Sequence, residues 1–259
     1  MKKKLETLYM AIIFIFLYAP IGTLIVLSFN SSKSRSKWGG FTLEWYQKMF
    51  DSSTIMSALQ NTLTIAFLSA LIATVIGVLV CIGINSLRKW QKNTILALNN
   101  IPMLNADIVT GLSLMLMFVF FGVSLGYNTI LLAHITFNIP YVILSVMPKM
   151  KQTNMSAYEA AQDLGANPIY AFFKVIFPDL VPGIISGFLL AFSMSLDDFI
   201  ITHFTKGAGI NTLSTLIYSE VRRGIQPTIY ALSTLIFVTV LILLLLVNFL
   251  PAKKEKAAK

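Results

Sequence analysis

Long apolar runs, most of them near 20 residues or longer, dominate the sequence, and no lysine or arginine lies within them. A helix needs about 20 apolar residues to cross the hydrocarbon core of a bilayer. Charged residues make up 12% of the chain, whereas a soluble domain carries about 25%. We therefore predict an all-α membrane protein, with residues 1–259 forming a single transmembrane domain. The six predicted spans cover approximately residues 8–27, 58–84, 95–121, 128–148, 180–202 and 228–250.

The positive charges lie in the loops and predict which side of the membrane each loop faces. With six spans, one set of loops and both ends carry 13 of the 20 lysines and arginines, and the other set carries 7. Loops that stay inside the cell carry the excess of Lys and Arg. We therefore expect both termini in the cytoplasm, and we assign the net charge of +9 to membrane orientation rather than to nucleic-acid binding.

The polar segment 149–179, between the fourth and fifth spans, falls on the same cytoplasmic side. Ser156 followed by Glu159 has the spacing of a capping box at a helix start. Gly165 can end that helix, and Asn167-Pro168 can begin the next. The pattern predicts two short helices that meet at a glycine outside the bilayer, although an ordinary loop helix fits the capping pattern equally well.

Three carboxylates lie inside apolar runs: Asp107, Asp197 and Asp198. A charged group at bilayer depth is unfavourable and usually faces a cavity or a transport pathway. We expect at least one of them to border a water-filled path, with Ser193 or Ser195 beside it. Such a path favours a cation, which aromatic faces can also hold. The alternative for Asp197 and Asp198 is a hydrated helix end.

Catalytic and metal-binding patterns are missing from the sequence. It has no Gly-rich phosphate loop of the P-loop type, so energy from ATP has to come from another subunit. One cysteine (Cys81) and two scattered histidines are too few for a typical zinc site. We predict a protein that is not itself an enzyme and that needs no cofactor.

The last external loop, residues 203–227, contains apolar residues at helical spacing. We expect a short helix capped by Asn211, reaching Val221 and ending near Gly224. Arg222 and Arg223 then project outward, either as solvated charges or as part of a docking surface for an acidic partner.

Three segments resemble type I ABC-importer permeases of the EAA-loop (MetI-like) family. The stretch from Glu159-Ala160-Ala161 through Gly165 to Ile176-Phe177-Pro178 is similar to the EAA loop of that family, although many members have a leucine before the proline. The segments Trp38–Tyr46 and Ser195–Phe199 are similar to the spermidine/putrescine branch. The resemblance extends over the whole chain.

This resemblance implies a six-helix permease of the bacterial inner membrane with a cytoplasmic coupling helix. The implied partners are a homologous second permease, two copies of a cytoplasmic ABC ATPase and an extracytoplasmic polyamine-binding protein. Another solute (ferric ion, thiamine or an amino-acid derivative) remains an alternative, as does a channel or carrier that acts alone. The residues expected to couple to the ATPase are Tyr158, Glu159, Ala160, Ala161, Asp163 and Gly165. The residues expected along the substrate pathway are Trp45, Asp107, Ser193, Ser195, Asp197 and Asp198. Arg222 and Arg223 are expected to contact the binding protein.

Overall fold

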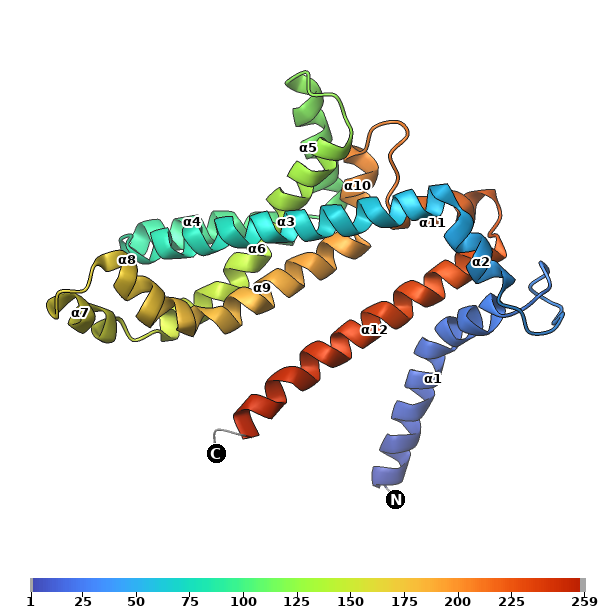
Figure 1. Cartoon of the computed structure of the whole chain (residues 1–259), viewed down its shortest axis with the longest axis horizontal. Coiled ribbons are helices and arrows are strands. Elements are labelled where there is room, and N and C mark those ends of the chain that lie inside the picture. The colour runs from blue at the N-terminus through green and yellow to red at the C-terminus, as the bar shows by residue number, and fades with distance from the viewer. Residues whose placement is uncertain (1, 257–259) are drawn as a thin grey trace. The chain divides into compact units, whose positions relative to one another are not determined.

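The computed structural model describes residues 2–256, with side chains described for residues 6–242 (Figure 1). The described residues are mostly helical, and their one isolated β-bridge joins Asn30 to Phe41. The prediction of an all-α protein is confirmed. The elements are α1 (Lys2–Ser28), α2 (Glu44–Asp51), α3 (Ser53–Asn85), α4 (Lys89–Leu104), α5 (Asp107–Phe120), α6 (Tyr127–Gln152), α7 (Met155–Asp163), α8 (Pro168–Ala171), the π-helical turn η1 (Phe172–Ile176), α9 (Phe177–Asp197), α10 (Ile200–Thr205), α11 (Leu213–Arg223) and α12 (Pro227–Lys256).

Four helical segments among the described residues are long and apolar enough to cross a bilayer: Glu6–Ser28, Ser53–Asn85, Tyr127–Gln152 and Pro168–Asp197. The pair α4 and α5 makes a fifth if it is taken as one broken span. The predicted last span, 228–250, extends past the side chains that are described, and the described part of α12 is apolar from Pro227 to Ile242. The total of six spans therefore stays a prediction.

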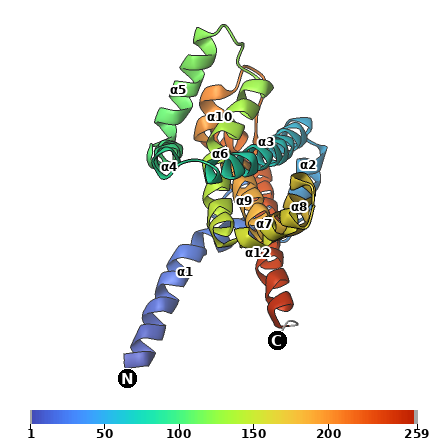
Figure 2. The same ribbon diagram turned by 90° about the vertical axis from the view of Figure 1, so that its left-hand side faces the viewer.

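The third predicted span, 95–121, is not one continuous helix. α4 ends at Leu104, α5 begins at Asp107, and the two helices are bent by 103°. Figure 2 shows α4 almost end-on, with α5 rising steeply from it. Asn105 and Ala106 between them have extended backbone, with ψ of 150° and 138°. A carboxylate in the first turn favours a helix start, so Asp107 suits the beginning of α5.

The fifth predicted span, 180–202, is also interrupted. α9 ends at Asp197, and α10 starts at Ile200. Asp198 between them has φ of −59° and ψ of 127°, which is not helical. Its side chain accepts hydrogen bonds from the N–H groups of Ile201 and Thr202 in the first turn of α10. At the break these N–H groups have no helical carbonyl partner, and the side chain serves as their acceptor.

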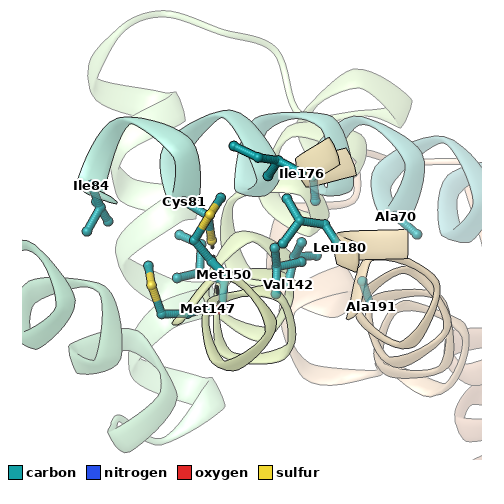
Figure 3. Packing of buried hydrophobic residues seen from close by; sticks show 12 residues of the cluster. Ala70, Cys81, Ile84, Val142, Met147, Met150, Ile176, Leu180 and Ala191 are labelled. Carbon is teal, nitrogen blue, oxygen red and sulfur yellow. Dashed lines mark hydrogen bonds between the residues drawn. The ribbon is translucent and has the colours of Figure 1, made fainter. Parts of the chain in front are cut away.

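The chain divides into two compact units, which are residues 1–56 with 216–259, and residues 57–215. In the second unit, α3, α6 and α9 share an apolar core, where Figure 3 shows Val142 of α6 beside Leu180 of α9. The helices approach closely because glycines face them. A Cβ atom on Gly77 would lie 2.6 Å from Cγ1 of Val142, and one on Gly187 would lie 3.3 Å from Cα of Val142. Small residues at helix contacts are typical of membrane bundles.

In the first unit, α12 packs against α1 and α2. The loop between α1 and α2 is ordered by Asn30, whose side-chain amide donates to the carbonyl of Lys37 at 2.9 Å and accepts from the N–H of Gly39 at 2.8 Å. The indole N–H of Trp45 donates to the carbonyl of Asn30 at 2.7 Å. Trp45 is buried, and Lys48 lies over its ring.

The polar segment after α6 forms the two short helices that were predicted. Gly165 has φ of +89°, a conformation that favours glycine, and it ends α7. Asn167 accepts a hydrogen bond from the N–H of Ile169 at 3.0 Å and caps α8. The predicted capping box is wrong in one respect: Asn154 is the N-cap of α7 and accepts from the N–H of Ser156 at 3.1 Å. Ser156 therefore lies inside the helix.

Candidate functional site

A pocket of about 390 Å³ lies in the second unit, next to both helix breaks. Its walls come from α4, α5, α6, α9 and α10. The residues that give it chemical character are three carboxylates and three aromatic rings, Asp107, Asp197, Asp198, Phe137, Tyr141 and Phe199. The breaks in α4–α5 and α9–α10 thus place polar residues around one space in an otherwise apolar bundle.

All three carboxylates from the apolar runs line this pocket. Asp107 is the first residue of α5, Asp197 is the last residue of α9, and Asp198 lies in the link to α10. Among the residues that the structure describes, no lysine or arginine lines the pocket. The lining is therefore negatively charged when the carboxylates are ionised, and it is suited to a cationic ligand.

Asp198 is held firmly by the start of α10. Its Oδ2 atom accepts hydrogen bonds from both the N–H and the hydroxyl of Thr202, each at 2.8 Å. Its Oδ1 atom accepts from the N–H of Ile201 at 3.3 Å. The side chain is only 9% exposed. Because hydrogen bonds to an ionised group are stronger than neutral ones, the carboxylate has one preferred orientation.

The buried imidazole of His134 contacts this carboxylate. Nε2 of His134 lies 2.8 Å from Oγ1 of Thr202 and 3.4 Å from Oδ2 of Asp198. Nδ1 of the same ring lies 2.5 Å from Oγ of Ser195. The His134 side chain is 1% exposed. One histidine therefore joins α6 to the end of α9 and to α10.

The polar contacts continue to α3. Oγ of Ser195 lies 3.1 Å from Oγ of Ser69, and the amide of Asn138 donates to Ser69 at 3.3 Å. Ser69, Asn138, Ser195 and Thr202 are all buried. Such a network specifies one arrangement of the helices beside the pocket, because a buried polar group that loses its partner is destabilising.

The other residues expected along the pathway lie elsewhere. Ser195 belongs to the buried network rather than to the lining of the pocket. Ser193 is exposed on α9, and Trp45 lies in the first unit with its indole bonded to Asn30. The structure brings Asp107, Asp197 and Asp198 together, and a role in transport stays a prediction for all six residues.

Sequence reasoning missed four members of the network, Ser69, His134, Asn138 and Thr202. One signal was present. His134 and Asn138 are four residues apart in the apolar run 128–148, which places them on one face of a helix. Polar and ionisable residues inside a span usually face the bundle interior. Ser69 on α3 and Thr202 on α10, which contact this polar face, do not belong to a comparable sequence pattern.

The segment expected to couple to the ATPase presents a mixed surface. Glu159, Ala160, Asp163 and Gly165 are exposed, whereas Tyr158 and Ala161 are half-buried. Tyr158 packs against the core of the second unit. Leu164, beside the glycine that ends α7, is 91% exposed.

Arg222 and Arg223 are exposed in the last turn of α11, as expected, and Arg222 lies 5.8 Å from the ring centre of Tyr218. Gly224 has φ of +110° and follows the helix end. The expected cap is wrong, because the side chain of Asn211 accepts from Lys206 at 2.6 Å. The N–H of Leu213, the first residue of α11, donates instead to Thr62 at 2.8 Å.

Comparisons with known proteins extend these observations. The family model described as "Binding-protein-dependent transport system inner membrane component" matches residues 73–254. The chain is 35% identical over 251 residues to the spermidine/putrescine transport system permease protein PotC of Haemophilus influenzae, covering 97% of this chain and 98% of that relative. It is 39% identical over 250 residues to the putrescine transport system permease protein PotI of Escherichia coli, covering 94% of this chain and 89% of the relative.

Two solved structures are similar in fold. A chain of a bacterial ABC transporter involved in the import of the acidic polysaccharide alginate has a TM-score of 0.69 at 18% identity, covering 96% of this chain and 94% of that one. A chain of the MetNI methionine ABC transporter in an inward-facing conformation has a TM-score of 0.61 at 20% identity, covering 80% of this chain and 99% of that one. At these identities the likeness shows the fold.

Apolar helices of this length indicate an integral membrane protein, and carboxylates around a pocket between them are typical of a transport pathway. The matched family and the relatives narrow the class further: the chain belongs to the inner-membrane components of binding-protein-dependent transport systems.

Proposed function

We propose that this chain is the permease subunit of an ATP-driven, binding-protein-dependent importer of polyamines such as spermidine and putrescine. The names of the relatives over nearly the whole chain support this substrate class. The observation that carries the proposal is the pocket lined by three carboxylates. A polyamine presents several ammonium groups on a flexible hydrocarbon chain, so it matches negative charge combined with apolar walls.

Each part of the pocket then has a chemical role. Asp107 and Asp197 are exposed and offer carboxylate oxygens to an ammonium group. Phe137 and Tyr141 lie on the same lining and give aromatic surface, which suits both methylene groups and a cation over a ring face. An ammonium group loses water when it leaves solution, and the carboxylates of the pocket partly replace its interactions with that water.

The chain holds no ATP site of its own in this proposal, and the work comes from two copies of a cytoplasmic ABC ATPase. The exposed surface of α7 around Glu159, together with Leu164, forms the docking face. A nucleotide-dependent partner of this kind biases a membrane element between two states. A homologous second permease completes the translocation pathway.

The proposed orientation places both termini and the segment 149–179 in the cytoplasm of a bacterial cell. The excess of Lys and Arg on that side supports it. The opposite face receives the polyamine-binding protein, with Arg222 and Arg223 at the contact. Residues 1–259 act as a single permease domain.

Uptake by the complete importer tests the proposal. Cells that lack polyamine uptake receive this chain, its sister permease, its ATPase and its binding protein, and accumulation of radiolabelled spermidine and putrescine is measured. ATP-dependent uptake that needs all four components is the expected result. Uptake of ferric ion, thiamine or an amino acid without polyamine uptake overturns the substrate, and uptake by this chain alone overturns the architecture.

A further inference from the structure

The hydrogen bond between His134 and Thr202 can be assigned a single direction. The hydroxyl of Thr202 donates to Oδ2 of Asp198. A hydroxyl has one hydrogen, so its oxygen must accept from the N–H at Nε2 of His134, 2.8 Å away. Nδ1 lies 2.5 Å from Oγ of Ser195, and the direction of that hydrogen bond depends on whether Nδ1 carries a proton. The imidazole N–H thus donates to the Thr202 hydroxyl, and that hydroxyl donates to the Asp198 carboxylate in the pocket.

The Thr202 hydroxyl has a possible alternative acceptor, a backbone carbonyl of its own helix, which is the kind of acceptor that Thr205 uses. The hydroxyl of Thr205 donates to the carbonyl of Ile201, four residues earlier, at 2.8 Å. This is the common behaviour of threonine in helices. The equivalent carbonyl for Thr202 is that of Asp198, which already accepts from the hydroxyl of Ser214 at 2.6 Å. The observed contacts direct the Thr202 hydroxyl hydrogen at the carboxylate, with the imidazole N–H at its oxygen.

We propose that His134 is a positioning residue for the pocket: acting through the hydroxyl of Thr202, it fixes the Asp198 carboxylate in the orientation that receives an ammonium group of the substrate. This inference rests on the proposed function. Without the imidazole, the Thr202 oxygen is a buried acceptor without this donor, and the carboxylate loses the 3.4 Å contact with Nε2. The hydroxyl of Thr202 no longer has a single direction, so the carboxylate is oriented less firmly, by the backbone N–H groups of Ile201 and Thr202.

The charged and titratable groups around this arrangement come from several elements. Asp198 contacts the imidazole, while Asp107 from α5, Asp197 from α9 and Tyr141 from α6 line the adjoining pocket. From α3 the network receives the hydroxyl of Ser69.

Two amide substitutions separate positioning from simple filling of space. In His134→Gln the amide nitrogen reaches the place of Nε2 and keeps the donor to Thr202. In His134→Asn the amide reaches only the place of Nδ1, so it keeps the contact with Ser195 and loses Thr202. Both variants are polar and similarly buried. Uptake of labelled spermidine and putrescine is measured in the complete importer and divided by the amount of assembled complex.

We expect His134→Gln to keep at least about half of the maximal rate and His134→Asn to lose about tenfold, the effect of one hydrogen bond to a charged network. The apparent KM should stay constant, because the binding protein captures the substrate. A second pair uses the hydroxyl: Thr202→Ser should retain uptake, and Thr202→Val should lose it. Equal rates within either pair, or losses explained by the amount of complex alone, overturn the proposal. If the wild-type importer moves no polyamine, the proposed function itself fails, and that failure is visible before any variant is made.

Discussion

Asp197 and Asp198 are adjacent in the chain, yet their carboxylates have different surroundings. Asp198 accepts three hydrogen bonds from Ile201 and Thr202 and contacts His134. The Asp197 carboxylate accepts no hydrogen bond from any other residue that the structure describes, and it lines the same pocket. The helix end between them causes the difference, because Asp197 closes α9 and Asp198 caps α10. Asp198 therefore shapes the pocket, while Asp197 offers its charge to a ligand.

Replacing Asp197 with Asn should lower the maximal rate of polyamine uptake by about tenfold, because a charged acceptor for an ammonium group becomes neutral. The amount of assembled importer should not change, since no described residue depends on this carboxylate. Uptake of labelled spermidine per complex measures the effect. Asp51→Asn, at the exposed end of α2, is the matched control, and equal uptake by both variants would contradict a pathway role.

Replacing Asp198 should affect stability as well as transport. Asp198→Ala removes the cap of α10 and is expected to lower the free energy of unfolding by about 1–2 kcal/mol. Asp198→Asn keeps an acceptor oxygen for the N–H groups of Ile201 and Thr202, so its loss of stability should be smaller. Thermal unfolding of the purified complex in detergent provides the measurement. An unfolding temperature of Asp198→Ala equal to that of the unaltered complex would show that the cap is not stabilising.

The glycines of α3 should differ sharply in their tolerance of a methyl group. Gly77→Ala places Cβ 2.6 Å from Cγ1 of Val142, and such overpacking is expected to destabilise the protein by about 1–3 kcal/mol. Gly83→Ala has no atom within 4 Å of the new Cβ and should be neutral or stabilising by up to about 1 kcal/mol. Thermal unfolding distinguishes them, and equal stability would argue against the close contact between α3 and α6.

Charge reversal at Glu159 should uncouple the ATPase without disturbing the membrane part. Glu159→Lys alters an exposed residue of α7, so insertion into the membrane should be normal. The ATPase should no longer remain with the membrane fraction, and uptake should fall by about tenfold or more, as for a charge removed from a docking interface. Quantitative blotting of washed membranes tests this, with Asp51→Lys as the control. Normal ATPase retention in Glu159→Lys would count against α7 as the docking element.

The start of α7 can be tested with two neighbouring substitutions. Asn154→Ala removes the side chain that accepts from Ser156 and should weaken the helix by about 1 kcal/mol. Ser156→Ala changes a residue inside the helix and should have little effect. Hydrogen exchange of the α7 amides should become roughly fivefold faster in the first variant alone. The opposite ranking would restore Ser156 as the cap.

Local patterns in the sequence predicted the parts of the fold that depend on local chemistry. The apolar runs gave the helices, and Gly165 and Asn167 correctly marked the ends of α7 and α8. The two interruptions were harder to place. Asp107 does begin a helix, but the 103° bend depends on how α5 packs against α10, which lies about ninety positions away in the sequence.

For the candidate site too, features that depend on single residues could be predicted and features that depend on packing between helices could not. A carboxylate is unfavourable in the hydrocarbon core of a bilayer, which predicted that at least one of Asp107, Asp197 and Asp198 faces a polar space. The structure places all three in the lining of one pocket. The network behind them could not be predicted, because Ser69, His134 and Thr202 come from three different helices. Single hydroxyl groups in apolar helices usually bond their own backbone, so nothing in the sequence distinguishes Ser69 and Thr202, which bond across helices.

The close packing of α6 against α9 limits how this protein can move. α9 runs without a break from Phe177, next to the π-helical turn, to Asp197 at the pocket, a length of about 30 Å at 1.5 Å per residue. A Cβ atom on Gly183 would lie 3.1 Å from the carbonyl oxygen of Ser145, and one on Gly187 would lie 3.3 Å from Cα of Val142, so the two helices are closely packed at both positions. We therefore expect α6 and α9 to move together, so that a displacement of α9 at Phe177 also moves Asp197 at its other end.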